Sequence, residues 1–331
     1  MDGGHRMRRR LAQFLCFGLV FVLLSGLLLG YGIFVQQTPP MAVDVEIKPG
    51  TSVRQMARLL ASKGIIRSPL AFEWLVRLRG YSSDMTHGYY HFEGPANALT
   101  IMDRIHRGDV MHFQVTIPEG LRNEEIVRLL SEHTGLPSER WQQALLKVVP
   151  DGRDGYLLPE TYRYEKPIEP ESLLMQMRKA QEHLLRNIES DVEKWDRLRV
   201  MASIIEKETA LDSERPLIAA VIENRLRRGM PLQMDPTVIY GLLRTKGSFS
   251  GNLRKQDLLT DTPWNTYTRR GLPPTPICNP GSASLRAAAE PADVPFLYFV
   301  ADGSGGHAFA SSLEEHRRNV ARWVSLERRR R

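Results

Sequence analysis

A charge-free apolar run near the start of the chain most constrains what this sequence can fold into. Residues 11–35 read LAQFLCFGLVFVLLSGLLLGYGIFV and contain no Asp, Glu, Lys or Arg. A helix over these positions is about 37 Å long, which is enough to cross a bilayer with some tilt. A cleaved signal peptide would need a shorter apolar core and a small-residue cleavage site, and the following residues offer none. We therefore expect one retained transmembrane helix.

The charges before this run predict its orientation. Four arginines lie within residues 1–10, and basic residues beside a span stay on the cytoplasmic side. Residues 1–10 are then a cytoplasmic N-terminus and residues 11–35 contact membrane lipid. Everything after residue 36 lies outside, in the periplasm or on the extracytoplasmic face of a one-membrane cell. We expect a single-pass protein of the cell inner membrane.

The overall charge of +7 does not predict a nucleic-acid partner. Basic residues gather at the two ends of the chain, in residues 1–10 and in Arg328–Arg331. No segment resembles a recognition helix or a sheet that mixes aromatic and basic residues. The C-terminal arginines are expected to contact acidic lipids or to form a solvated end.

Cysteine usage excludes several chemistries. Cys16 lies inside the apolar run and Cys278 lies far along the exported part, so the two cannot form a disulfide. We expect Cys278 to be a packed residue rather than a nucleophile. The sequence has no CxxC, no HExxH and no Cys/His cluster with metal-ligand spacing, so we expect no metal and no cofactor.

Two segments seventy residues apart share one pattern. Residues 43–64 and 115–135 each begin with alternating apolar residues, pass through a turn, and continue as an amphipathic helix. Without a gap, Ile47 matches Ile117 and Gly50 matches Gly120. This plan resembles the LysM carbohydrate-binding fold. Two interpretations remain open: the module binds glycan, or it only positions the next domain.

A pair of glutamates two residues apart suggests acid–base chemistry. In a helix over residues 199–210, Met201, Ile204 and Ile205 share one stripe with Glu208, whereas Glu206 points to the opposite side. A carboxyl group among apolar side chains loses water and its pKa rises, which suits a general acid. The alternative is that Glu208 reaches solvent at the edge of the core. We expect Glu206 to be solvated and its amide variant to keep most activity.

Downstream segments add candidate contacts for a sugar. Ser213 is expected to cap a helix with Pro216 in its first turn, and Asp235 before Pro236 is typical of another helix start. We interpret Asp235 first as a cap and second as a site residue. FLYFV, residues 296–300, predicts a buried strand followed by a glycine turn. The candidate substrate-binding side chains are Gln233, Asp235, Asn265, Tyr267, His307 and Glu160. Glu160 lies in the aromatic segment GYLLPETY, within residues 136–198, which we otherwise interpret as a connecting region.

Several long motifs also carry a resemblance. SIIEKETA, LQMDPTVIYG, WNTYTRRGLPPTPICNPG and LYFVADGSGGHAF, together with GYLLPETY and the apolar helix, resemble the endolytic murein transglycosylase family (MltG, YceG-like). The likeness runs from about residue 43 to residue 325. It implies an α+β protein with LysM-like βα modules over residues 43–135 and a catalytic domain over residues 136–331. It also implies peptidoglycan glycan strands as the substrate, peptidoglycan synthases (penicillin-binding proteins) as candidate partners, and Glu208 as the essential acid.

The reaction implied by this family needs only one carboxyl group. Glycoside hydrolases use two carboxylates, whereas a lytic transglycosylase uses the C6 hydroxyl of the muramic ring as the nucleophile and leaves a 1,6-anhydro end. Two alternatives remain. One is a muramidase-type hydrolase that recruits Asp235 as its second carboxylate. The other is a membrane-anchored, non-catalytic scaffold that binds peptidoglycan.

Overall fold

The chain folds into two compact units. The computed structural model describes residues 3–39 and 41–330, with side chains described for residues 13–39 and 41–328. The N-terminal unit comprises Met1–Phe113 and Arg163–Ile168, and the C-terminal unit comprises Gln114–Tyr162 and Glu169–Arg331. The predictions for the arginines of residues 1–10 and for Arg331 concern side chains that lie outside the described ones. The division at residue 113 differs from the boundary predicted at 135, because the second strand–turn–helix segment packs almost entirely in the C-terminal unit.

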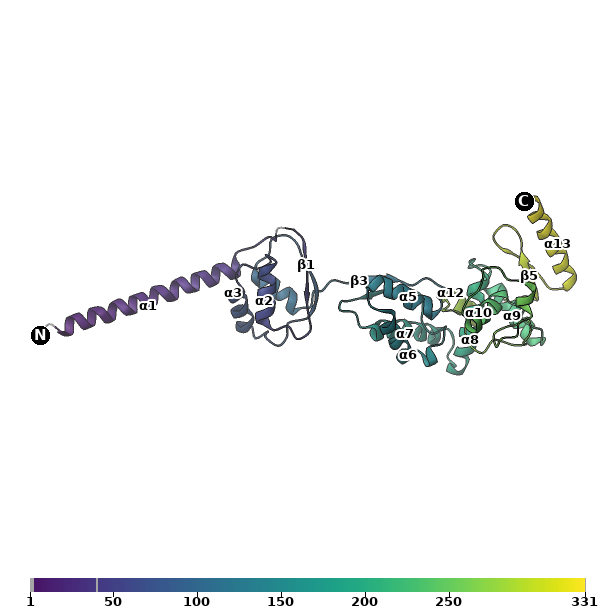
Figure 1. Ribbon diagram of the computed structural model, residues 1–331, viewed down its shortest axis with the longest axis horizontal. Coiled ribbons are helices and arrows are strands. Elements are labelled where there is room, and N and C mark those ends of the chain that lie inside the picture. The colour runs from purple at the N-terminus through teal and green to yellow at the C-terminus, as the bar shows by residue number, and fades with distance from the viewer. Residues whose placement is uncertain (1–2, 40, 331) are drawn as a thin grey trace. The chain divides into compact units, whose positions relative to one another are not determined.

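The chain begins with a long helix, α1 (Gly3–Phe34), drawn in purple in Figure 1. Its segment Gln13–Phe34 is long and apolar enough to cross a membrane, and its side chains are mostly exposed. Such a helix is compatible with a single-pass anchor. Gln37 then pairs with Ala96 through two backbone hydrogen bonds of 2.8 and 3.0 Å, so the chain just after α1 is held against the rest of the N-terminal unit.

The N-terminal unit has a strand–helix–helix–strand order followed by one more helix. Its elements are β1 (Val43–Ile47), α2 (Val53–Ser62), α3 (Pro69–Leu78), β2 (Gly88–Phe92) and α4 (Ala98–His106). Strands β1 and β2 pair antiparallel, with Val43 opposite Phe92 and Ile47 opposite Gly88. Ser52 and Gln55 form a capping box that starts α2. The strand–turn–helix predicted for residues 43–64 is confirmed.

The C-terminal unit opens with the same order of elements. Strand β3 (Phe113–Thr116) pairs with β4 (Thr161–Tyr164), and α5 (Asn123–Thr134) and α6 (Ser138–Val148) lie between them in sequence, before the short 3-10 helix η1 (Pro150–Gly152). The repeat predicted from the sequence is therefore confirmed and is longer than predicted. Residues 136–198, interpreted as a connecting region, contain α6 and β4 in addition to the helix α7 (Pro170–Ile188).

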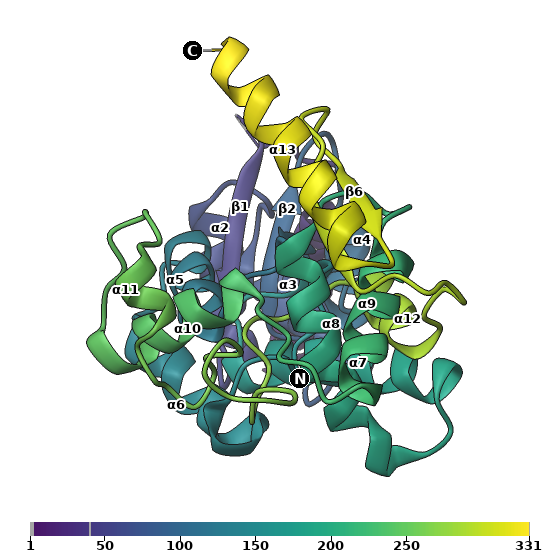
Figure 2. The same cartoon turned by 90° about the vertical axis from the view of Figure 1, so that its right-hand side faces the viewer.

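The remainder of the C-terminal unit packs around one central helix. Helix α8 (Trp195–Glu208) follows the 3-10 turn η2 (Val192–Lys194) and contacts α9 (Arg215–Arg227), α10 (Asp235–Lys246) and α12 (Ser282–Ala289). The core here includes Met201, Ile204, Ile205, Ile218 and Leu285, all with no exposed surface. The short α11 (Lys255–Leu258) follows α10. Helix α13 (Leu313–Arg330) lies over the hairpin of β5 (Tyr298–Ala301) and β6 (His307–Ala310) (Figure 2).

Three local predictions in this unit are wrong. Glu214 rather than Ser213 occupies the N-cap position of α9. Asp235 is the first residue of α10 and makes no capping bond, because Met234 occupies the N-cap. Strand β5 is only half-buried, since its single partner strand and α13 leave part of it open.

Candidate active site

Glu208 is the last residue of α8 and faces the apolar side of that helix. Met201, Ile204 and Ile205 have no exposed surface, which confirms the predicted stripe. The pKa of Glu208 is raised to about 8: burial contributes most to the rise, the nearby Asp235 charge adds to it, and Arg225 opposes both. Within the described residues no group hydrogen-bonds to the Glu208 carboxyl. The side chain therefore holds a proton near neutral pH and is free to donate it.

An open cavity of about 430 Å³ adjoins this carboxyl group. Besides Glu208, it is lined by Glu119, Glu206, Lys207, Thr209, Ala210 and Arg215. The lining is strongly polar, which suits a hydroxyl-rich ligand better than an apolar one. Burial raises the pKa of Glu119, and the charge of Glu206 adds to this effect.

Glu206 is buried, and the prediction that it is solvated is wrong. Its side chain is 7% exposed, it accepts a hydrogen bond of 3.0 Å from the Gly281 backbone N–H, and it lies 3.6 Å from Arg215. Arg215 also pairs with Glu119 and Asp212. Helical periodicity predicts that Glu206 projects away from the Glu208 stripe, yet both residues line the cavity. It could not show that the loop leading to α12 covers that opposite face.

Asp235 and Tyr267 lie together beside the acid. The Tyr267 hydroxyl donates a hydrogen bond of 2.5 Å to the Asp235 carboxylate. Burial raises the pKa of Tyr267, and the bond to Asp235 adds to this shift. Gln233 is exposed nearby with a left-handed backbone, φ 51°, and its N–H donates to the Thr266 carbonyl at 3.1 Å. Asp235 and Tyr267 are thus close enough to Glu208 for their charges to interact with it, and Gln233 lies two residues before Asp235 in the chain.

Arg225 is a site residue that the sequence analysis missed. It is 7% exposed, and its guanidinium donates to the carbonyls of Leu297 at 2.6 Å and Leu232 at 2.5 Å. Its guanidinium carbon lies 5.3 Å from the centre of the Tyr298 ring, and burial lowers its pKa. Arg225 follows Ile218 by seven residues and Ile222 by three, so it falls on the apolar stripe of α9. The argument used for Glu208 could have found it.

His307 acts inside the fold rather than at an open surface. Its side chain is 18% exposed and its Nδ1 lies 2.7 Å from the Glu214 carboxylate. Glu214 also accepts from the His307 backbone N–H at 2.6 Å and from the Thr209 hydroxyl at 2.9 Å. Burial raises the pKa of Glu214, but these hydrogen bonds outweigh it and the pKa is lowered. This chain of contacts fixes the backbone directly after Glu208.

Asn265 and Glu160 are less suited to the roles predicted for them. Asn265 has no exposed surface, and its amide nitrogen donates to the carbonyls of Leu258 and Thr260 at 3.0 and 2.7 Å. Its carbonyl accepts from the Tyr267 N–H at 2.8 Å, so Asn265 shapes the loop and does not reach a ligand. Glu160 is exposed, and its charge contributes to the raised pKa of Glu119.

Asn279 joins two of the sequence motifs. It is fully buried, and its carbonyl accepts from the N–H groups of Gly155 and Leu157, each at 3.0 Å. Its amide nitrogen donates to the Leu121 carbonyl at 3.0 Å. The Asn279 side chain therefore holds GYLLPETY against the loop that covers Glu206. This role explains why a polar residue occurs among the prolines and apolar residues of that loop.

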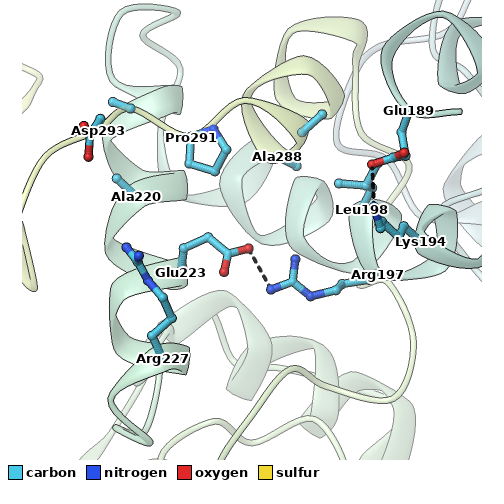
Figure 3. Close-up of a pocket in the computed structure, with 12 residues that line it drawn as sticks. Glu189, Lys194, Arg197, Leu198, Ala220, Glu223, Arg227, Ala288, Pro291 and Asp293 are labelled. Carbon is cyan, nitrogen blue, oxygen red and sulfur yellow. Dashed lines mark hydrogen bonds and ion pairs between the residues drawn. The ribbon is translucent and has the colours of Figure 1, made fainter. Parts of the chain in front are cut away.

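A second cavity lies near the other end of α8 (Figure 3). It has a volume of about 380 Å³, and four of its charged groups form two ion pairs. Arg197 lies 2.7 Å from Glu223, and Lys194 lies 3.5 Å from Glu189. Two of its three carboxylates are thus neutralised in place, and the third, Asp293, is exposed, so none of them is a buried acid without a partner, and we assign the site to Glu208.

The described residues contain no group of three or more His, Cys, Asp or Glu side chains that could hold a metal ion. Cys278 is fully buried with its thiol 3.4 Å from the Ser203 carbonyl, and burial raises the pKa of that thiol well above its usual value. A thiol that stays protonated is a poor nucleophile, so Cys278 has a packing role.

The fold and the site define a class: an α+β protein that holds one protonated carboxylic acid at the edge of an open polar cavity. The YceG-like family model matches residues 45–322, and the chain belongs to that family. The resemblance seen in the sequence motifs is confirmed.

Relatives of known name extend along most of the chain. The endolytic murein transglycosylase of Bacillus subtilis is 30% identical over 319 residues, which cover 88% of this chain and 87% of that protein. The endolytic murein transglycosylase of Streptococcus pneumoniae is 28% identical over 86% of this chain but 58% of its own length. The crystal structure of a YceG-like protein from Listeria monocytogenes superposes with a TM-score of 0.54 at 28% identity, covering 84% of this chain and 98% of that one.

Proposed function

We propose that this protein is an endolytic murein transglycosylase, a lyase that cuts peptidoglycan glycan strands internally. The observation that carries the proposal is the Glu208 carboxyl group, whose pKa is raised to about 8 by burial at the edge of an open cavity. A group in that state can give a proton to a glycosidic oxygen at neutral pH. The names of the Bacillus and Streptococcus relatives indicate the substrate and the reaction type.

The proposed reaction begins with proton transfer. Glu208 protonates the oxygen that joins N-acetylmuramic acid to N-acetylglucosamine, the C1–O bond breaks, and the leaving sugar departs with a new hydroxyl. The Glu208 carboxylate then takes the proton of the C6 hydroxyl on the muramic ring, and that oxygen bonds to C1. Glu208 ends protonated as it began, no water is consumed, and the product has a 1,6-anhydro end.

Nearby charges support this cycle. Arg225 favours the carboxylate form of Glu208, so it stabilises the state that exists after the first proton transfer. The C6 hydroxyl belongs to the ring that it attacks, so its effective concentration is high. A second carboxylate to activate water is then unnecessary. Asp235 and Tyr267, with Gln233 beside them, are the side chains we propose to contact the sugar.

The identity of the product tests the proposal. The full chain in detergent is incubated with purified uncrosslinked glycan strands, and the new ends are identified by mass spectrometry. We expect 1,6-anhydro-muramic ends from internal cuts. Reducing ends would instead identify a muramidase-type hydrolase that uses Asp235. Strand binding without any soluble product would identify a non-catalytic scaffold.

Three finer points belong to the same proposal. Helix α1 is the anchor, with its N-terminus in the cytoplasm and the catalytic unit in the periplasm, at the inner membrane. The strand–helix–helix–strand unit over β1 to β2 is LysM-like and helps to hold the strand, while synthases supply the nascent strand. Labelling of engineered cysteines on each side of α1 tests the orientation, and strand pull-down by Glu208→Gln tests the binding role.

A further inference from the structure

Helix α3 exposes a row of large apolar side chains. Leu70, Trp74 and Leu78 are 62%, 52% and 77% exposed. Their spacing of four residues places them on one face of the helix. The opposite face is buried, with Phe72 and Val76 fully enclosed. Among the described residues after Val35, the other exposed large apolar side chains lie singly along the chain: Met41, Leu146, Val192, Leu211, Leu259 and Leu313.

The start of α3 packs directly against the end of α1. A Cβ added at Gly32 would lie 2.9 Å from the Ala71 Cβ and 3.1 Å from the Ser68 Cβ, so only glycine allows this approach. The Arg67 guanidinium lies 5.3 Å from the centre of the Tyr31 ring, which joins the same two helices. Figure 1 shows α3 on the side of the N-terminal unit from which α1 emerges.

This contact sets the depth of α3 relative to a membrane. The apolar segment Gln13–Phe34 has 22 residues, which is about 33 Å of helix and matches a hydrocarbon core of about 30 Å. Gly32 is two residues from the end of that segment, at the level of the lipid headgroups. Gln37 is already paired with Ala96, so no flexible spacer separates the unit from the span.

The charges around the row fit a lipid surface. Arg67, Arg77 and Arg79 are exposed at the two ends of α3. The acidic residue of the helix, Glu73, is 5% exposed and is paired with Arg77 at 3.3 Å and Arg54 at 3.8 Å. The exposed part of α3 therefore presents apolar and basic groups. Such a helix binds membranes with anionic headgroups.

We propose that α3 is an interfacial membrane helix that lies in the surface of the same bilayer that α1 spans. Leu70, Trp74 and Leu78 enter the boundary between headgroups and acyl chains, at a depth of about 5–10 Å, and the arginines contact lipid phosphates. Trp74 occupies the position that tryptophan favours in membrane proteins. The N-terminal unit is thereby held at two points, α1 and α3, which fixes its tilt against the membrane.

Tryptophan quenching in nanodiscs tests the proposal. The full chain is placed at one copy per disc in phosphatidylcholine and phosphatidylglycerol, with or without bromine on the upper acyl chain. The chain has five tryptophans, so the signal of Trp74 is taken as the difference between wild type and Trp74→Phe. We expect bromine to quench that difference signal by about half or more, as befits an interfacial tryptophan.

A second variant keeps Trp74 and removes its neighbours in the row. In Leu70→Ser/Leu78→Ser we expect bromine to quench Trp74 less, and both positions are exposed, so the fold is retained. Equal Trp74 signals in brominated and plain discs would overturn the proposal. It would also be overturned if Trp74 became shielded only in discs that hold two copies, which would identify the row as a self-association surface.

Discussion

The last turn of α8 carries two glutamates whose side chains have different partners. Glu208 lies on a face with no hydrogen-bonding partner among the described residues, and its pKa is raised to about 8. Glu206 lies on the other face, 3.6 Å from Arg215 and hydrogen-bonded to Gly281. Both side chains are removed from bulk water to a large extent. The partner, and not burial alone, therefore decides whether a carboxyl group is an acid ready to react or part of the scaffold.

The largest expected effect is on activity and comes from substitution of Glu208, which has no hydrogen-bonding partner among the described residues. Glu208→Gln keeps the shape of the protonated side chain but has no proton to give, so we expect strand cleavage to fall by about 10³-fold or more. Release of anhydro ends measures the loss, and thermal unfolding shows that the fold is kept. Cleavage near the wild-type rate would mean that another group is the acid, and the comparison between the two faces would lose its meaning.

Substitution of Glu206, which has partners, should affect the stability of the fold first. Glu206→Gln leaves Arg215 with less compensation in a buried position, so we expect a loss of about 3 kcal/mol in the free energy of unfolding. Activity should fall by about tenfold, because Glu206 itself lines the cavity beside Glu208. Chemical denaturation measures the first quantity. The matched control is Glu119→Gln, whose side chain is 43% exposed and should change stability much less. Equal behaviour of the two variants would restore the expectation that Glu206 is solvated.

The sequence predicted the direction of both glutamates but the environment of only one. Period and spacing place Met201, Ile204 and Glu208 on one stripe, since those properties are local to the helix. The partners of Glu206 come from residues that lie far along the chain, and no local pattern encodes them. The same limit explains Asn265. Its polar side chain is typical of a sugar contact, but it makes its hydrogen bonds within its own loop. The repeat was predicted from matched positions, but its second helix and closing strand were not.

The pH dependence of stability separates the acid from its paired neighbour. The folded pKa of Glu208, about 8, is above its ordinary value of 4.5, so the folded state binds the proton more tightly. Stability is then unaffected below about pH 4.5, falls as pH rises between about 4.5 and 8, and stays low above that. Glu208→Gln removes this penalty, so we expect it to be more stable than wild type at pH 8.5 by up to about 5 kcal/mol. At pH 4 the two should unfold at the same denaturant concentration, and a difference that persists there would contradict the raised pKa.

The smallest expected effect comes from Asp235, whose charge adds to the effect of burial on the pKa of Glu208. Asp235 raises the pKa of Glu208 as the second cause after burial, so Asp235→Asn should lower that pKa. The alkaline limb of kcat/KM, where Glu208 loses its proton, should move to lower pH by less than about one unit, because burial remains. The position of the limb is read rather than its height, since Asp235 also stands where we place the sugar. Asp261→Asn is the matched control, because Asp261 is exposed and paired with Arg269 at 2.9 Å, away from the groups that act on Glu208. A limb that stays in place in Asp235→Asn would show that burial alone sets the proton affinity of Glu208.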